Sequence, residues 1–373
     1  MAQERLRLTT VAGELVIPRT DFLSLEVELD SELASLFKLR LAIRQQSNGT
    51  WTYVDDERFQ VWKPLTIHVG FATTTDELMS GYITHIKPEF YRDAAYCTVE
   101  ILGMDGSVRM DREEKLRAWP QEKDSAIASQ LFSLYGFSSV VVETPVEHDE
   151  KVSTIIQHET DMQLLKRLAL RNGYECYVDG KTGFFEPPRL EGTPQPLLAV
   201  HCGPTETNVN RFSLEMNALT PTNVAMVQVD RINKTVLETA VESGQQQVLG
   251  RANATGLLAT GVAPGQVHVS RNTTTGKAEM DTLCQELYHQ AEWFISAEGE
   301  IDGNHYAHVL KPHGTVTIKG IGEAYSGMYY VTHVTHTFRA HGYTQFFRAK
   351  RNAVHVTGTE DFTAPAVRRN RFL

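Results

Sequence analysis

The sequence predicts an α+β protein, mainly antiparallel β, with two related β-barrel modules, an inserted α/β segment and one long helix. Short runs of alternating apolar and polar residues, broken by Gly, Asn and Asp, are typical of half-buried antiparallel strands. Residues 80–86 (SGYITHI) also recur, with small changes, within residues 326–334 (SGMYYVTHV). Two distant copies of one strand pattern favour a duplicated β-module.

The first β-barrel module is expected in residues 1–112. Apolar and polar residues alternate in residues 23–29, 39–43 and 65–69. Asn48-Gly49 is a strong signal for a hairpin turn. Several short strands without a long helix predict a small barrel or sandwich.

A mixed α/β insert is expected in residues 113–188. Capping residues and apolar spacing predict one helix near residues 124–136 and a second near residues 160–173. Residues 174–185 read as a hairpin around Asp-Gly, and Pro187-Pro188 marks a domain boundary.

The second β-barrel module is expected to be split. It begins in residues 189–276, is interrupted by a helix in 277–298, ends in 299–355, and leaves a tail in 356–373. A hairpin around His341-Gly342 closes the module. The helix is the strongest in the chain because apolar residues recur every three or four positions, at Met280, Leu283, Cys284, Leu287, Ala291, Phe294 and Ile295.

Charge and cysteine content exclude several classes of protein. The formal net charge of −10 argues against general binding to nucleic acid or to an anionic membrane. The four cysteines are far apart and form no CxxC pair, which favours free thiols in a reducing compartment. The N-terminus lacks the apolar core of a signal peptide, so we expect a protein made and kept in the cytoplasm, or exported by another route.

Candidate catalytic and metal-binding residues form no motif. His333 and His336 lie three apart on an expected strand, so they point to opposite faces and cannot share a metal without a bulge. No GxSxG, Walker loop or HExxH occurs, and Gly320-Ile321-Gly322 lies between strands rather than before a helix. We therefore expect no catalytic residue, no cofactor and no metal, and a protein that is not an enzyme.

Several stretches, taken in order, resemble one family. They are residues 78–84 (LMSGYIT), 99–105 (VEILGMD), 156–161 (IQHETD), 164–169 (LLKRLA) with Gly173-Tyr174, and 320–343 with Gly-Ile-Gly, Tyr-Val-Thr and Gly-Tyr. Their order and spacing are similar to the late control protein D family of contractile-tailed phages, a baseplate hub family. That family is related in fold to the N-terminal half of the VgrG spike proteins of type VI secretion. Leu164 or Leu165 replaces the family's usual aromatic residue.

The resemblance implies a structural baseplate hub of a contractile tail or injection particle. It implies a homotrimeric ring that adapts a hexameric inner tail tube to a trimeric spike. Only a short tail follows the second module here, so we expect a separate spike protein. The tape-measure protein and other baseplate proteins are further expected partners. Assembly would occur in the bacterial cytoplasm, within a phage virion or tail-like particle, without specific nucleic-acid binding or membrane insertion.

The residues expected to matter are therefore structural or at interfaces. Gly81 and Gly327 are expected to permit the turn into the long strand of each module. Aromatic residues are expected to fill barrel cores or interfaces, namely Tyr82, Tyr330 and Phe338. Three residues are expected to dock the long helix, namely Leu283, Leu287 and Phe294.

Two other functions stay open from the sequence. A tail-tip peptidoglycan hydrolase would need a carboxylate pair in a cleft. A receptor- or carbohydrate-binding β-protein would expose clustered aromatic residues, whereas the four tryptophans are scattered along the chain.

Overall fold

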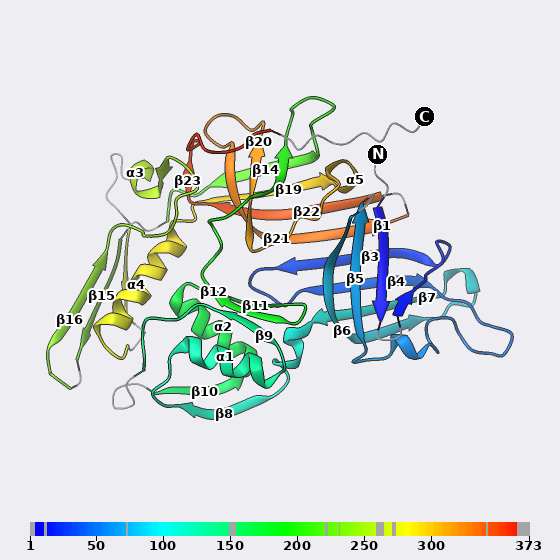
Figure 1. Ribbon diagram of the computed structural model, residues 1–373, viewed down its shortest axis with the longest axis horizontal. Helices are drawn as coiled ribbons and strands as arrows, with labels where there is room; N and C mark the ends of the chain where they lie inside the picture. The colour runs from blue at the N-terminus through cyan, green and yellow to red at the C-terminus, as the bar shows by residue number, and fades with distance from the viewer. Residues whose placement is uncertain are drawn as a thin grey trace.

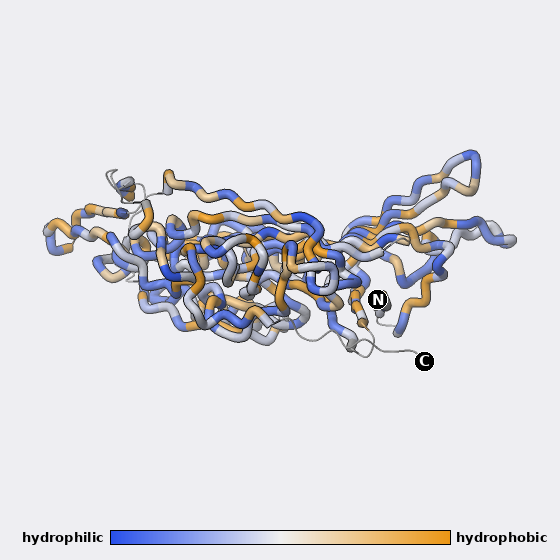
Figure 2. The backbone as a smooth tube through the Cα atoms, turned by 90° about the horizontal axis from the view of Figure 1, so that it is seen from above, coloured by the Kyte–Doolittle hydropathy of each residue, from blue (hydrophilic) through white to orange (hydrophobic). Residues whose placement is uncertain are grey.

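The computed structural model describes residues 4–10, 13–71, 74–148, 154–220, 223–230, 232–258, 265–270, 274–340 and 342–363. Viewed from above, the molecule is elongated and flat, thick at one end and with projecting loops at the other (Figure 2). Long strands cross its centre, and most helices lie at the thick end (Figure 1). In the described ranges no helix is both long and apolar enough to cross a membrane.

Five strands near the N-terminus form the first five-strand group. They are β3 (Phe22–Asp30), β4 (Leu36–Ala42), β5 (Pro64–Phe71), β6 (Thr74–Glu89) and β7 (Thr98–Asp105). Apolar side chains alternate inward along them, so Leu25, Val27 and Leu39 are fully buried in one core. β1 (Glu4–Thr10) and β2 (Gly13–Leu15) extend the sheet beyond β5 and cross β3 and β4 steeply (Figure 1).

Five later strands form the second five-strand group. They are β14 (Val209–Met216), β19 (Ile295–Asp302), β20 (Gly314–Lys319), β21 (Gly327–Arg339) and β22 (Gly342–Arg351). Neighbours in the first group run β3-β4-β7-β6-β5, and neighbours in the second run β14-β19-β22-β21-β20. Both groups therefore place their first, second, fifth, fourth and third strands side by side in that order.

The two groups belong to one 13-stranded sheet. They join where β21 pairs antiparallel with β3, and β13 (Gln195–Ala199) adds parallel to β20. Two aromatic residues of the second group, Phe338 and Tyr343, lie in the core of the first. Apolar burial therefore continues across the junction between the groups.

The insert between the groups packs around its own core. Its elements are β8 (Glu114–Trp119), α1 (Asp124–Leu134), β9 (Ser138–Val141), β10 (Ile155–Thr160), α2 (Asp161–Asn172), β11 (Glu175–Asp179) and β12 (Thr182–Glu186). Helix α2 begins in a capping box between Thr160 and Gln163 and ends at Gly173, whose φ of 66° is left-handed. Both expected helices and the expected Asp-Gly hairpin are present.

An arm projects from the second group between β14 and β19. It contains β15 (Asn223–Val229), β16 (Val236–Val241), β18 (Gln266–Val269) and α4 (Lys277–Ala291). The α4 helix packs on this small sheet (Figure 1). Shorter elements are β17 (Ala252–Asn253), α3 (Ala254–Leu258), α5 (Gly303–Tyr306), β23 (Ala353–Val354) and the 3-10 turns η1 (Glu57–Phe59), η2 (Ala94–Tyr96) and η3 (Gly106–Arg109).

The predicted extent of the long helix is wrong. Helix α4 ends at Ala291, not within residues 297–298, and Ile295 begins strand β19. Residues 295–302 alternate between buried and more exposed positions and pair with both β14 and β22. Pairing with two strands satisfies the backbone hydrogen bonds of residues 295–302. The sheet therefore overrides the helix expected to continue to residue 298. The fold class, α+β and mainly antiparallel β, is confirmed.

Candidate functional site: the strand edges and the junction cavity

The repeated sequence pattern coincides with a repeated bulge. Against β7, strand β6 bulges at Thr84, between Ile83 and His85, and against β22, strand β21 bulges at Thr332. The Thr84 hydroxyl donates to the carbonyl of Leu102 at 3.4 Å, and the Thr332 hydroxyl donates to that of Arg348 at 3.3 Å. A bulge changes the twist of a strand, and the same bulge in both groups bends both long strands alike.

The bulges align the two groups residue by residue. Ile83 pairs with Gly103 just before the first bulge, and Val331 pairs with Ala349 just before the second. The Ile-Thr-His and Val-Thr-His segments are therefore equivalent. The preceding Ser-Gly pairs are not, because two extra residues separate Gly327 from its bulge.

The role predicted for Gly81 as a turn residue is wrong. Gly81 lies in the middle of β6, and a Cβ there would lie 2.1 Å from the carbonyl oxygen of Met104. Gly327 begins β21 with a φ of 138°, and a Cβ there would lie 2.6 Å from Nη2 of Arg351. Both positions require glycine because another part of the chain approaches closely.

The junction between the groups is a continuous ladder. His333 to Arg339 of β21 pair with Asp30 to Ser24 of β3. His333 Nδ1 lies 2.9 Å from Asp30 Oδ2 at the start of this ladder. Burial alone would raise the pKa of Asp30, but hydrogen bonds from His333 and from the backbone N–H groups of Glu32 and Leu33 lower it to about 2. The charged carboxylate thus stabilises the junction.

The equivalent half of β6 has a free side. On one side β6 pairs with β7 as far as Glu89, but on the other β5 reaches only Tyr82. In the described part of the chain no strand pairs with that side of residues 85–89. Among the described residues, strand β14 likewise pairs only with β19 and ends the strand order. Open edges of this kind are ready to accept another strand. Pro88 in β6 is a sequence signal for an edge, because proline cannot donate to a ladder.

The predicted structural residues lie in several different places. Tyr330 is fully buried and donates to Glu175 Oε2 at 2.7 Å, and Phe338 lies in the first core. Tyr82 is half-buried beside Arg109, whose guanidinium lies 5.9 Å from its ring centroid. Leu283 and Leu287 contact the arm sheet from α4, whereas Phe294 lies beyond α4 in the core of the second group.

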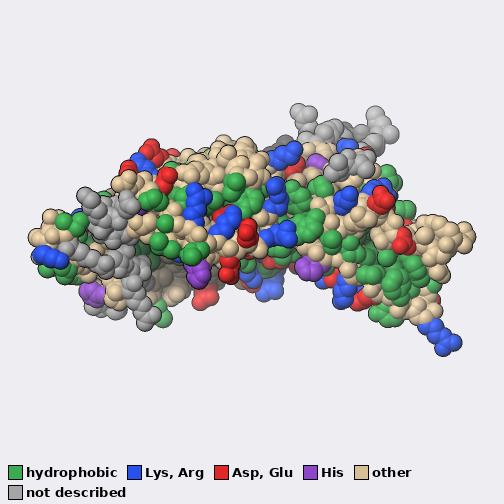
Figure 3. All heavy atoms as spheres, turned by 90° about the horizontal axis from the view of Figure 1, so that it is seen from below, with side chains coloured by type: hydrophobic (Ala, Val, Ile, Leu, Met, Phe, Trp, Pro, Cys, Tyr) green, Lys and Arg blue, Asp and Glu red, His purple; other side chains and the backbone are tan. Residues whose placement is uncertain are grey.

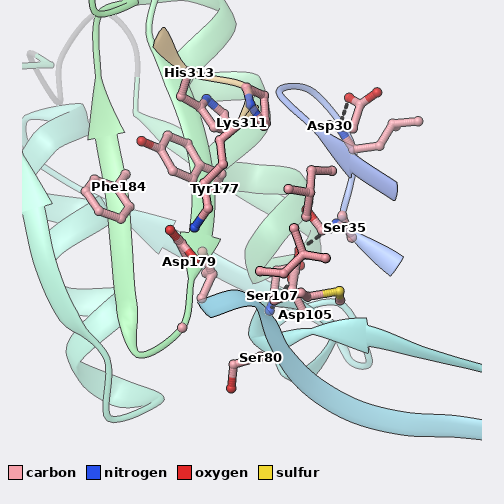
Figure 4. Close-up of a pocket in the computed structure, with 18 of the residues that line it drawn as sticks. Asp30, Ser35, Ser80, Asp105, Ser107, Tyr177, Asp179, Phe184, Lys311 and His313 are labelled. Atoms are coloured by element: carbon pink, nitrogen blue, oxygen red, sulfur yellow. Dashed lines mark hydrogen bonds between the residues drawn. The ribbon is translucent and has the colours of Figure 1, made fainter. Parts of the chain in front are cut away.

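A cavity of about 190 Å³ lies where both groups meet the insert (Figure 4). On one wall, Tyr177 stacks between Phe184 at 4.6 Å and His313 at 3.5 Å, measured between ring centroids. His313 Nδ1 lies 2.7 Å from Glu175 Oε2. These contacts join the insert to the second group.

The opposite wall of the cavity is also internally bonded. Asp105 accepts hydrogen bonds from the backbone N–H groups of Ser35 at 2.6 Å and Ser107 at 2.8 Å. Burial raises the pKa of this carboxyl. Within the described ranges, no three His, Cys, Asp or Glu side chains are grouped to hold a metal. The cavity lining therefore braces three parts of the molecule against one another.

Solved structures share this fold. The 43 kDa tail protein of prophage MuSo2 from Shewanella oneidensis has a TM-score of 0.69 at 13% identity, covering 94% of this chain and 100% of that one. A tail protein from Neisseria meningitidis has a TM-score of 0.66 at 10% identity, covering 95% and 98%. The E. coli c3393 protein, a component of the type VI secretion system, has a TM-score of 0.54 at 10% identity, covering 92% and 76%.

Sequence comparison gives a family for most of the chain. Among curated proteins none matches. The model of the Alg8 N-terminal domain family matches residues 6–340, most of the 373-residue chain. This protein therefore belongs to the Alg8 N-terminal domain family, with a fold shared by phage tail proteins.

Proposed function

We propose that this protein is a structural baseplate hub of a contractile tail or injection particle, in which three copies form a ring. One observation carries the proposal: the chain contains two equivalent five-strand groups and fills only one of two equivalent junctions. The fold similarity to phage tail proteins and to a type VI secretion component supports a role in a tail. A relationship to the late control protein D family is part of the proposal.

Two open strand edges support the proposed ring. Inside the chain, the second half of β21 pairs with β3. In the equivalent arrangement, residues 85–89 of β6 pair with β14 of the next copy. Each copy then offers one free β6 edge and one free β14 edge, a heterologous contact that closes when the rotation allows.

The alignment of the groups predicts a register for this pairing. In the first group, Val27 pairs with Phe37, which pairs with Gly103. In the second group, Leu214 pairs with Ala297, which pairs with Ala349, the equivalent of Gly103. Val27 and Leu214 are therefore equivalent. If the contact between copies keeps the β21–β3 register, Ile86 lies opposite Met216 of the next copy. Lys87 then lies opposite Glu215.

These pairs are chemically compatible. Ile86 and Met216 are apolar, and they correspond to Val334 and Leu29, which are buried at the internal junction. Lys87 and Glu215 carry opposite charges, which favours cross-strand neighbours. Pro88 removes one donor from the ladder, so pairing there is weaker than in β21.

The ring explains how one chain meets partners of different symmetry. Three copies with two groups each present six similar groups around one axis, which suits a hexameric inner tail tube. The chain itself repeats only three times, which suits a trimeric spike carried by a separate protein. The tape-measure protein and other baseplate proteins are further proposed partners. We propose assembly in the bacterial cytoplasm and no catalytic role.

Solution mass, a low-resolution image and a cysteine crosslink test the proposal. We expect a trimer with a central hole, alone or with its spike. In a Cys202→Ser background, Lys87→Cys with Glu215→Cys should form disulfide-linked trimers, because directly opposite Cβ atoms lie about 5 Å apart. The matched control, Lys87→Cys with Arg211→Cys, is four residues out of register and should stay uncrosslinked. A stable monomer with no ring under all these conditions would overturn the proposal.

A further inference from the structure

The third strand of each group, β5 or β20, is preceded by a residue with the same unusual backbone conformation. Trp62 has a φ of 67° and donates its N–H to the carbonyl of Ile83 at 2.7 Å. His313 has a φ of 64° and donates its N–H to the carbonyl of Val331 at 3.1 Å. Ile83 and Val331 are equivalent, so Trp62 and His313 are equivalent as well. A left-handed conformation is rare for such large residues.

The two side chains have different surroundings. His313 is covered by the insert, through the ring of Tyr177 and the carboxylate of Glu175. Trp62 is 42% exposed, and its next neighbour Val61 is also exposed. The guanidinium of Arg112 lies 4.4 Å from the ring centroid of Trp62, which covers one side of the indole. A large aromatic residue is thus held in a strained backbone position with much of its surface uncovered.

Trp62 lies directly beside the open half of β6. Its N–H bonds to Ile83, two residues before the free stretch at 85–89. At the internal junction, the residues before β20 and the β3–β4 turn line one cavity. Figure 4 shows His313 from the first segment and Ser35 from the second. The equivalent of the β3–β4 turn is the segment that leaves β14. In an assembly of copies, that segment of the next copy would lie beside Trp62.

Two large apolar side chains, at the end of β14 and just after it, are exposed. Met216 is 44% exposed, and Leu219 is 91% exposed. The backbone N–H of Leu219 donates to Asn217 Oδ1 at 2.9 Å, which shapes the turn that presents this side chain. Hydrophobic side chains also gather on the underside of the molecule over the first group (Figure 3). Matching apolar surface on two parts of one chain suits a contact between copies.

We propose that Trp62 is an anchor that packs against Met216 and Leu219 of a second copy of this chain. The inference rests on the proposed ring, because it uses the β6–β14 pairing to bring the two surfaces together. Aromatic anchors buried at the centre of an interface contribute much of its binding energy, because they remove a large apolar area from water at low entropic cost.

Substitutions in the full chain test the anchor. Trp62→Ala and Leu219→Ala should each weaken trimer formation about tenfold or more by sedimentation equilibrium. The double variant should be little weaker than either single variant, because the two side chains contact each other. Trp62→Phe should retain most of the affinity, and Leu116→Ala, an exposed leucine on the insert strand β8, should retain all of it. Circular dichroism of each monomer checks folding, and Leu219→Ala changes a side chain too exposed to affect it.

The crosslink at Lys87 and Glu215 separates the two proposals. If trimers form and crosslink in register, but Trp62→Ala and Leu219→Ala assemble like the wild type, the anchor is wrong and the hub stands. Additive losses in the double variant would likewise overturn the direct contact. Absence of any trimer or crosslink would overturn the ring, and the anchor with it.

Discussion

His333 and Asp30 are separated by 303 residues in the chain, yet His333 Nδ1 lies 2.9 Å from Asp30 Oδ2. The contact stands at the first pair of the β21–β3 ladder. It ties the beginning of the chain to its last long hairpin at the start of the internal junction. Both residues are largely buried, so their interaction is little screened by water.

Replacement of Asp30 tests the junction. Asp30→Asn should lower the free energy of unfolding by roughly 2 kcal/mol at pH 7, because the native pKa lies well below the usual 3.8. Because the native pKa is lower, the carboxylate stabilises the fold when the pH is above the unfolded-state pKa. This stabilisation is lost as the pH falls toward the native pKa. The gap between wild type and variant should therefore narrow between pH 3.8 and 2. Urea titrations at pH 7, 4 and 3 measure it, and a pH-independent gap would contradict the assignment.

Buried His336 should make the protein sensitive to mild acid. Burial, together with the charge of Lys311, lowers its pKa to about 3, while Nδ1 lies 2.7 Å from the Tyr343 hydroxyl. Below the usual pKa of 6.5 the unfolded chain binds a proton that the native chain does not, so stability falls as pH falls. Between pH 7 and 5, the free energy of unfolding of His336→Gln should fall by about 2 kcal/mol less than that of the wild type. Urea titrations of both proteins at pH 7, 6 and 5 measure the difference, and an equal loss of stability in wild type and variant would contradict the assignment.

The close approach at Gly81 should not tolerate a side chain. Gly81→Ala places a methyl group 2.1 Å from the carbonyl oxygen of Met104, so β6 or β7 must move. We expect a loss of about 2–4 kcal/mol in the free energy of unfolding. Gly276→Ala, where a Cβ has open space and the φ of 178° is extended, should change stability little. Equal effects of the two substitutions in thermal unfolding would refute the steric explanation.

Gly327 and Arg351 should behave as one unit. Arg351 is fully buried and donates to the carbonyls of Leu249, Tyr325, Ser326 and His355. A methyl group at residue 327 would displace its guanidinium. Gly327→Ala and Arg351→Lys should each cost about 2–4 kcal/mol, and the double variant should cost less than their sum. Strict additivity in a denaturant double-mutant cycle would show that the two do not interact.

Charge exchange tests the proposed contact between copies. Lys87→Glu and Glu215→Lys should each weaken trimer formation severalfold, because like charges then face each other across the ladder. Combining them should restore assembly, and high salt should reduce all three effects. Analytical ultracentrifugation at low and high salt measures this. Failure of the double variant to recover would argue against the inferred register.

The amino-acid sequence by itself determined the classes of element and their periodicity. Alternation predicted the antiparallel strands, since a half-buried strand must change face at every residue. Capping signals placed helix α2 and its Gly173 stop, because these act within a few residues. The Ile-Thr-His and Val-Thr-His segments indicated duplication, and both lie at equivalent bulges.

Tertiary structure alone decided what depends on distant neighbours. Residues 295–298, expected at the end of the long helix, belong to a strand because β14 and β22 pair with them. Gly81 is required by the backbone of Met104, not by a turn. The edge of β21 is covered because it pairs with β3, whereas among the described residues the equivalent edge of β6 stays open. This pairing joins residues from opposite ends of the chain. The local spacing of residues determines which face of a strand or helix is apolar and where a helix ends. Pairing between distant strands determines which strand edges are covered.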